Sequence, residues 1–486
     1  MSEVPAPATT SVLPAPQNRV ALRLSALWVV RVAGAFAVGG ALVTCSWLVL
    51  AATERPSVLS GTAREAGFAP WIVGPLGHLM PGLTHDPTRL RRDLTVALCC
   101  LMVCWVVAVL AAPRLPVWFV AGALGLLGVL LFLSPPLSLT DLFNYLHYGG
   151  MSSVHGLNPY ADLPSAARND PSWRLSNWHH LLSPYGPLFT LATSLLALLP
   201  LHAAYWTWKA LVMLSAWGVL GVVAWTAPAV GRSRSRALAL VGLNPLVLVY
   251  GLGGHHNEPL MLLSVVGAVA LVVHAHTAPK PAPWSAGAGV AAVAGAGLKL
   301  SSVVLAPLIV LGAPRRRAAL GGAVVATAMT AAVVVLVFAG RLPATGVQDQ
   351  LVSPLSVPQV VGWLAGVGGE TATIRTVCHL LLALSVIAAG VVVARDRSRL
   401  PGACGVVMLV AVLTLGWTMP WYVWWVLPFA ALARTRWLTV ACVVLTLWLG
   451  LGAIPQMPQL IHGLGYYPSR SAVGREHHRM TERLLR

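Results

Sequence analysis

The residues best suited to chemistry in this chain gather in one polar stretch, residues 138–187. The stretch contains three aspartates, four histidines and four tyrosines, although only 9% of the 486 residues are charged. It follows an apolar run at residues 117–133 and precedes another. Long loops usually carry function or are disordered, and a loop this rich in aromatic residues does not favour disorder. We therefore expect this loop to be functional.

Four polar clusters and two lysines are expected to lie on the same face of the protein. They are Asp141, Asn144, Tyr145, Asn158 and Tyr160 in the first cluster, Tyr185 in the second, His255, His256, Asn257 and Glu258 in the third, Trp421 and Tyr422 in the fourth, and the lysines Lys209 and Lys299. Ionisable groups at membrane depth are costly and usually functional. A carboxylate can accept the proton of an attacking hydroxyl, and a lysine can bind phosphate as a point charge. The set suits a lipid-phosphate substrate, and the aromatic rings can stack on a sugar.

Each of these residues also has a structural interpretation that the sequence leaves open. Asp141 can cap the N-terminus of a helix. Lys299 can extend to the membrane interface, and Lys209 can anchor a helix there. Tyr160 and Tyr185 are next to proline or glycine and can simply pack a turn.

The histidines of the third cluster raise the question of a metal site. Imidazole and carboxylate groups are suitable metal ligands, and His255, His256 and Glu258 provide both. Adjacent histidines do not easily bind one ion together, so we expect these side chains to line a sugar site and expect no metal. Trp421 can alternatively belong to an aromatic belt at the membrane interface.

The composition indicates an all-α integral membrane protein. Apolar residues make up 57% of the chain and the mean hydropathy is +0.76, which leaves too little charge to cover a soluble protein of this length. We predict about 13 transmembrane helices in residues 19–454, because apolar runs long enough to span a bilayer recur there. Residues 1–18 are expected to be a disordered cytoplasmic tail, and residues 455–486 a C-terminal tail. We therefore expect a multi-pass protein of the plasma membrane.

The net charge of +18 does not indicate nucleic-acid binding. The basic residues lie in short clusters between apolar runs, namely Arg232, Arg234 and Arg236; Arg315, Arg316 and Arg317; Arg395, Arg397 and Arg399; and Arg434 and Arg436. Short basic loops of this kind mark the cytoplasmic side of a membrane protein. The polar clusters then fall on the extracytoplasmic side, and no nucleic-acid partner is expected.

Several apolar runs need separate treatment. Residues 188–199 are too short to cross a bilayer and are expected to lie on its surface or to re-enter it. Residues 237–252 and 422–433 are predicted as spans. Residues 286–311 form either one long helix or, as we prefer, two helices that meet near Lys299.

The order of the motifs resembles that of a known family. The motifs are TDLFNY at residues 140–145, GLNPY at 156–160, SPYGPL at 183–188, GGHHNE at 253–258, LKLS at 298–301 and PWYVWW at 420–425. The set is similar to that of the GT-C-type, polyprenol-phosphate-mannose-dependent alpha-1,6-mannosyltransferases of actinobacteria, together with the carotene-biosynthesis-associated membrane proteins. Where this chain has GGHHNE, the family usually has GGHND, so this chain has an additional histidine and a glutamate there.

The resemblance implies an inverting glycosyl transfer at the extracytoplasmic face. The donor would be a sugar, with mannose expected, on a polyprenyl phosphate, and the acceptor a glycan or glycolipid. The resemblance also implies that Asp141 is the general base. Lys209, with Lys299 or His255, would neutralise the leaving phosphate. No cofactor is expected.

Two functions of other classes stay open. A transporter or lipid flippase without chemistry would show inverted repeats and helices broken near the midplane, whereas the polar groups here are expected on one face. The resemblance to the carotene-associated group also leaves open a non-catalytic partner of carotenoid biosynthesis.

Overall fold

The computed structural model describes residues 16–54, 68–80, 86–138, 141–344, 346 and 351–485. Helices joined by turns make up these residues, and no strand occurs among them. The prediction of an all-α polytopic membrane protein is confirmed. Most of the tail expected at residues 1–18 lies outside the described ranges, and so do two residues of the functional loop.

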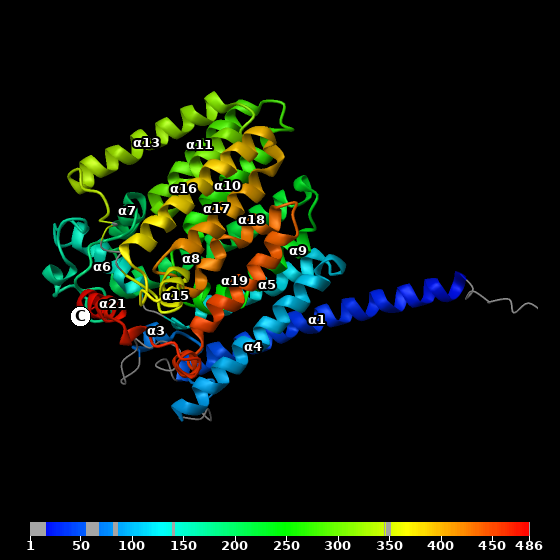
Figure 1. The fold of residues 1–486 in the computed structure, drawn as a ribbon, viewed down its shortest axis with the longest axis horizontal. Coiled ribbons are helices and arrows are strands. Elements are labelled where there is room, and N and C mark those ends of the chain that lie inside the picture. The colour runs from blue at the N-terminus through cyan, green and yellow to red at the C-terminus, as the bar shows by residue number, and fades with distance from the viewer. Residues whose placement is uncertain are drawn as a thin grey trace, which may run out of the picture.

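A bundle of long apolar helices forms the body of the protein (Figure 1). Its members are α1 (Pro16–Glu54), α4 (Pro87–Ala111), α5 (Val117–Leu133), α8 (Leu201–Thr226), α10 (Glu258–Ala275), α11 (Pro281–Leu298), α13 (Arg316–Phe338), α16 (Ala372–Arg395), α17 (Leu400–Thr414) and α19 (Trp437–Ala453). Single 3-10 turns join some of them, namely η1 (Ala112–Arg114), η3 (Pro228–Val230) and η6 (Arg397–Arg399). A helix satisfies its own backbone hydrogen bonds, which an apolar segment in a bilayer requires.

Within the described ranges, seven helices are long and apolar enough to cross a membrane. The number is up to eight if the bent pair of α19 and α20 (Met457–Gly463) counts as one span. Three shorter apolar helices accompany them, at Val117–Leu133, Pro187–Leu196 and Leu300–Gly312. The expected count of about 13 spans is not confirmed, because several apolar runs form broken helices rather than one long segment.

The run at residues 237–252 is broken in the middle. It comprises most of α9 (Arg234–Gly242), a turn at Asn244, and a π-helical segment, η4 (Val247–Leu252). The Asn244 side chain accepts hydrogen bonds from the backbone N–H groups two and three residues later, at 3.0 and 3.2 Å. Such a local bond competes with the helix and ends it.

The run at residues 422–433 is also divided. It consists of the end of a 3-10 helix, η7 (Pro420–Trp425), and the short helix α18 (Leu427–Leu432). At about 1.5 Å per residue in a helix, neither piece is long enough to cross a bilayer alone.

The run at residues 286–311 contains the expected break at Lys299. This residue has an extended backbone, with φ −145° and ψ 115°, directly after α11. A 3-10 helix, η5 (Leu300–Leu305), and α12 (Ala306–Gly312) follow it. The preferred interpretation of two helices that meet near Lys299 therefore agrees with the structure.

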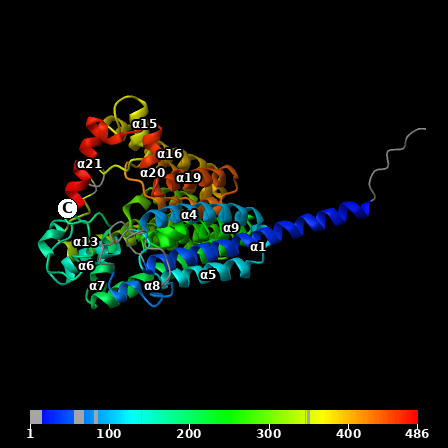
Figure 2. The ribbon, with the colours of Figure 1, turned by 90° about the horizontal axis from the view of Figure 1, so that it is seen from below.

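Short helices gather at one end of the bundle, on the left of Figures 1 and 2. They are α3 (Pro70–Val73), α6 (Asp141–Ser153), η2 (Pro164–Ala167), α7 (Pro187–Leu196), α15 (Val357–Leu364), η8 (Pro468–Arg470) and α21 (Ala472–Leu485). α21 contacts the loop between α6 and α7, where the backbone N–H of His180 donates to the carbonyl oxygen of Leu484 at 3.3 Å. The C-terminus thus lies at the same end as the functional loop.

Basic connections gather at the other end of the bundle (Figure 2). Arg232, just before α9, donates from Nε to the carbonyl oxygen of Ala433 at 2.7 Å and so joins the connection between α18 and α19. Arg236 and Arg436 line the same small hollow.

The packing of α11 on α13 generates a stability prediction. A Cβ atom added at Gly322 would overlap the carbonyl oxygen of Ala286, whereas one added at Gly321 would meet nothing within 4 Å. Small residues allow helices to approach this closely in a membrane. We expect Gly322→Leu to lower the thermal unfolding midpoint of the detergent-solubilised protein by several degrees, and Gly321→Leu to leave it unchanged. Scanning fluorimetry measures both, and equal midpoints would contradict the packing.

Candidate active site

The candidate site begins at Asp141, the first residue of α6. Nearly all of α6 is buried, and Asp141 is 6% exposed. A carboxylate in the first turn of a helix is stabilised by the positive end of the helix dipole. Its Oδ2 atom lies 3.4 Å from Nδ1 of His256, whereas its Oδ1 atom has no hydrogen-bond partner among the residues that the structure describes. One carboxylate oxygen is therefore available to a ligand.

His256 connects Asp141 to the aromatic side of the site. It lies in the turn between η4 and α10, and its ring stacks on Trp421 of η7 with centroids 3.6 Å apart. Its Nδ1 atom also lies 3.3 Å from the hydroxyl of Tyr145, one turn along α6. Its Nε2 atom has no partner. Three segments that are distant in the sequence thus meet at one imidazole.

An ion pair between Glu258 and Lys299 forms the second half of the site. Glu258 is the first residue of α10 and is completely buried. The Nζ atom of Lys299 contacts Oε1 of Glu258 and lies 3.3 Å from Oδ1 of Asn257. Both partners of the lysine keep a polar atom without a hydrogen bond, Oε2 of Glu258 and Nδ2 of Asn257.

Aromatic rings surround the ammonium group of Lys299. Its Nζ atom lies 5.1 Å from the ring centre of Tyr422 and 5.2 Å from that of Trp425, and these two rings stack on each other. A cation over aromatic faces gains about 0.5–2 kcal/mol. Trp425 belongs to the motif PWYVWW, which carries the fourth of the polar clusters expected from the sequence.

The electrostatics of the site raise the proton affinity of Asp141. Burial raises the pKa of this carboxyl group to about 7, the charge of Glu258 adds to the rise, and Lys299 opposes it. Burial lowers the pKa of His256 to about 3, so its imidazole is neutral. A carboxyl group that titrates near neutral pH is suited to take a proton from a hydroxyl. Within the described part of the chain, no group of three or more His, Cys, Asp or Glu side chains could hold a metal ion.

Three residues predicted to contact substrate use their polar atoms within the protein instead. Oδ1 of Asn144 accepts hydrogen bonds from two backbone N–H groups of the loop, at 2.9 and 3.2 Å. Nδ2 of Asn158 donates to a carbonyl oxygen at the end of α13 at 2.7 Å, and the Tyr160 hydroxyl donates to the backbone carbonyl oxygen of Tyr185 at 2.9 Å. These contacts favour a role in positioning the loop. The ring of Tyr185 packs edge-on against Tyr145 and so stays beside the site.

Lys209 lies in a separate buried cluster. Its Nζ atom donates to the carbonyl oxygen of Ser134 at 2.6 Å and lies 4.1 Å from the ring centre of Trp206. Among the described residues, Lys209 and Lys299 share no hydrogen-bond or aromatic partner. His255 belongs on the Lys209 side, with a positive φ of 51°, and its imidazole faces the charge of Lys209 and the backbone of Ser134.

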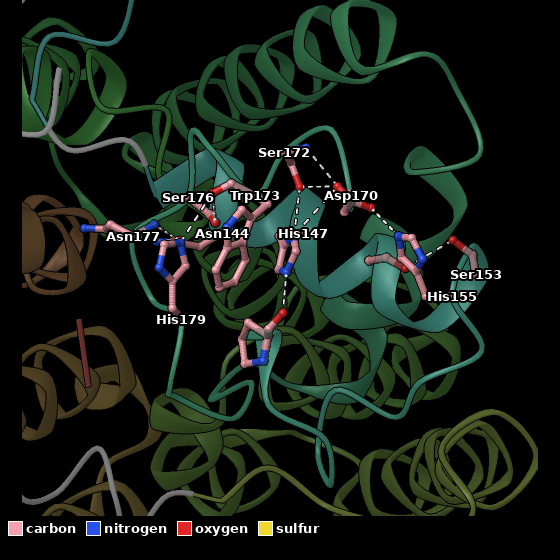
Figure 3. A network of polar contacts seen from close by, with 12 residues as sticks. Asn144, His147, Ser153, His155, Asp170, Ser172, Trp173, Ser176, Asn177 and His179 are labelled. Atoms are coloured by element: carbon pink, nitrogen blue, oxygen red, sulfur yellow. Dashed lines mark hydrogen bonds and ion pairs between the residues drawn. The ribbon is translucent and has the colours of Figure 1, made fainter. Parts of the chain in front are cut away.

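A polar network fastens the functional loop over α6 (Figure 3). Asp170 accepts hydrogen bonds from the backbone N–H and the hydroxyl of Ser172, at 2.9 and 2.5 Å, and lies 3.0 Å from Nε2 of His155. His147 of α6 lies 3.1 Å from the Ser172 hydroxyl. Burial alone would raise the pKa of Asp170, but hydrogen bonds with His147 and Ser172 hold it well below its ordinary value. No sequence motif predicts this network, because only the fold brings its members together.

Comparison with known proteins assigns a family. Residues 90–342 match the family model described as alpha-(1->6)-mannopyranosyltransferase, N-terminal domain. The chain is 27% identical to alpha-(1->6)-mannopyranosyltransferase A of Mycobacterium tuberculosis, over 65% of this chain and 66% of that protein. A second alpha-(1->6)-mannopyranosyltransferase of the same bacterium is 26% identical, over 66% of each chain. The matched part of the chain thus covers just under two thirds of the length of these relatives.

No solved structure matches the chain significantly. The family model, however, matches more than half of its residues. This chain therefore belongs to the alpha-(1->6)-mannopyranosyltransferase family.

Proposed function

We propose that this protein is a membrane mannosyltransferase. It transfers mannose from a polyprenyl-phosphate donor to a glycan or glycolipid acceptor at the extracytoplasmic face, with inversion at the anomeric carbon. The observation that carries the proposal is Asp141, a buried carboxyl group with a pKa of about 7 and one free oxygen. The names of the relatives support the transfer of mannose. The order of the motifs supports a lipid-phosphate donor.

Unpaired polar atoms around the site support a sugar as the ligand. They are Oδ1 of Asp141, Nε2 of His256, Nδ2 of Asn257, Oε2 of Glu258 and Nε1 of Trp425. A buried polar group without a partner costs about 1–3 kcal/mol. The hydroxyl groups of a hexose can both donate and accept, so one sugar can satisfy donors and acceptors alike. A purely apolar ligand cannot, so these atoms favour a hydroxyl-rich ligand.

In the proposed reaction, Asp141 takes the proton of the acceptor hydroxyl as its oxygen attacks the anomeric carbon. The bond between that carbon and the phosphate oxygen breaks in the same step, so a single displacement inverts the configuration. The proton stays on Asp141, and the negative charge leaves with the polyprenyl phosphate. Lys299 neutralises this charge as it develops, in a buried site where a fixed cation is more effective than in water.

The remaining residues position these two groups. His256 lies against Oδ2 of Asp141, which leaves Oδ1 for the acceptor. Trp421 and Tyr422 provide aromatic faces for the sugar. Lys209 binds the backbone that precedes α6, so we assign it to positioning rather than to phosphate contact.

Replacing the proposed base should nearly abolish transfer. Asp141→Asn keeps the size of the side chain but cannot accept the proton, so we expect a rate about 10²–10⁴-fold lower. The assay supplies radiolabelled polyprenyl-phosphate mannose and a lipid extract to membranes that contain the protein. Asp93→Asn, at a partly exposed aspartate of α4, is the matched control and should keep full activity.

Two outcomes of that assay would count against the proposal. Equal transfer by Asp141→Asn, at equal protein levels, would remove Asp141 as the base. No transfer by the unmodified protein from any polyprenyl-linked sugar would favour a transporter or a non-catalytic partner of carotenoid biosynthesis.

The pH dependence of the reaction should report the ionisation of Asp141. Its raised pKa of about 7 means that the base is protonated below this pH and ionised above it, so kcat/KM should fall as the pH drops through 7. Glu258→Gln removes a charge that raises this pKa and leaves Lys299 free to lower it. The acid limb of the pH–rate profile should therefore move to lower pH in this variant. A limb that stays in place would assign the titration to another group.

The proposed orientation can be tested with a membrane-impermeant thiol reagent on intact cells. A cysteine at Ser152, in α6, should react from outside. A cysteine at Thr277, in the connection between α10 and α11, should react only after the membrane is opened. The opposite pattern would place the candidate site on the cytoplasmic face and contradict an extracytoplasmic reaction.

A further inference from the structure

A groove at the basic end of the bundle has no part in the proposed reaction. It lies between α16, α17 and the start of α19 and has a volume of about 640 Å³. Small residues form much of its lining, namely Ala388 and Ala389 of α16 and Gly402 and Ala403 of α17. Their short side chains leave a trough between two helices that otherwise pack side by side.

The charged residues of the groove, Asp396, Arg399 and Arg434, all lie at helix ends. Ser398 and Arg399 belong to the connection between α16 and α17, and Arg434 and Thr435 to the connection between α18 and α19. The apolar lining continues along α16 from these residues to Ser385, about two and a half helical turns from the end of that helix. The groove therefore has a cationic end and an apolar length, as an amphiphilic ligand requires.

The charge at the cationic end is positive after its one carboxylate is counted. Asp396 accepts hydrogen bonds from the backbone N–H and the hydroxyl of Ser398, at 3.0 and 2.7 Å, and pairs with Nε of Arg399 at 3.1 Å. Arg434 is exposed and has no ion pair with any residue in the described ranges. One arginine is thus compensated by Asp396, and the other is free to bind an anion.

We propose that this groove binds an anionic membrane phospholipid. The phosphate lies between Arg434 and Arg399, and an acyl chain lies along the small residues of α16 and α17. Basic pockets between transmembrane helices at the cytoplasmic surface suit anionic lipid headgroups. Trp437, which is 51% exposed at the same groove, is a residue type favoured at the membrane interface. The sugar donor is a different ligand, because its phosphate is proposed to lie at Lys299, at the other end of the bundle.

The test measures which lipids the intact, full-length protein retains. The detergent-solubilised protein is incubated with equal amounts of phosphatidylglycerol and phosphatidylcholine, and the bound lipids are counted by native mass spectrometry. The unmodified protein should retain phosphatidylglycerol preferentially. Arg434→Gln should reduce that preference about fivefold, the contribution of one arginine near a membrane surface. Arg317→Gln is the matched control, since it removes the same charge from another basic connection, and it should change nothing.

A second pair of variants separates the groove from general surface charge. Ala388→Phe fills the trough without altering charge and should also reduce retention of phosphatidylglycerol. Ala383→Phe, at an exposed position of α16 outside the groove, should not. Unchanged retention in both Arg434→Gln and Ala388→Phe would overturn the proposal. Displacement of the lipid by inorganic phosphate alone, or by polyprenyl phosphate in preference to phosphatidylglycerol, would also overturn it. None of these outcomes depends on glycosyl transfer.

Discussion

A shortage of positive charge dominates the candidate site. Two carboxyl groups, those of Asp141 and Glu258, are buried there, but only Glu258 is in contact with Lys299. Removing an ion from water costs several kcal/mol unless a partner compensates it. Glu258 has such a partner, whereas Asp141 has a neutral imidazole and the N-terminal turn of α6. Because the compensation is unequal, the pKa of Asp141 is raised to about 7, and our proposal of Asp141 as the base rests on this difference.

The same constraint explains why the charged residues lie at helix ends. Asp141 and Glu258 each occupy the first position of a helix, where free backbone N–H groups stabilise a negative charge. Lys299 occupies an extended break between two helical segments. A continuous apolar helix would offer neither type of position. The broken runs around the site are therefore part of the chemistry that we propose, whereas the long apolar helices α13 and α16 contribute none of its charged residues.

The sequence predicts the charges of this site better than it predicts their partners. The break at Lys299, the cluster at Glu258 and the aromatic motif at Trp421 were all expected to lie together, and the structure places them together. Asn144 and Lys209 were expected there too, but their polar atoms bind backbone groups elsewhere. A motif shows which residue types are present, whereas only the fold shows which of their atoms are already bonded.

The number of spans could not be predicted for a related physical reason. Hydropathy measures how apolar a run is, and residues 237–252 and 422–433 are apolar enough to cross a bilayer. Their helices are nevertheless interrupted, in the first case by a side chain, Asn244, that bonds to the backbone. The mean hydropathy of a run changes little when one such residue is present. In this protein the interrupted runs are buried among other helices, so their free backbone groups do not meet lipid.

The ion pair of Glu258 and Lys299 also bears on how a phosphate can be bound and then released. An isolated lysine at this depth would be costly, and Glu258 removes that cost before any ligand arrives. A phosphate that enters must then share Lys299 with Glu258, so its binding in the ground state is limited. As the glycosidic bond breaks, the charge on the phosphate oxygen grows and its attraction to Lys299 increases. An interaction that strengthens along the reaction accelerates it more than one that is complete at the start. Under the proposed function, the glutamate thus makes the lysine more selective for the transition state.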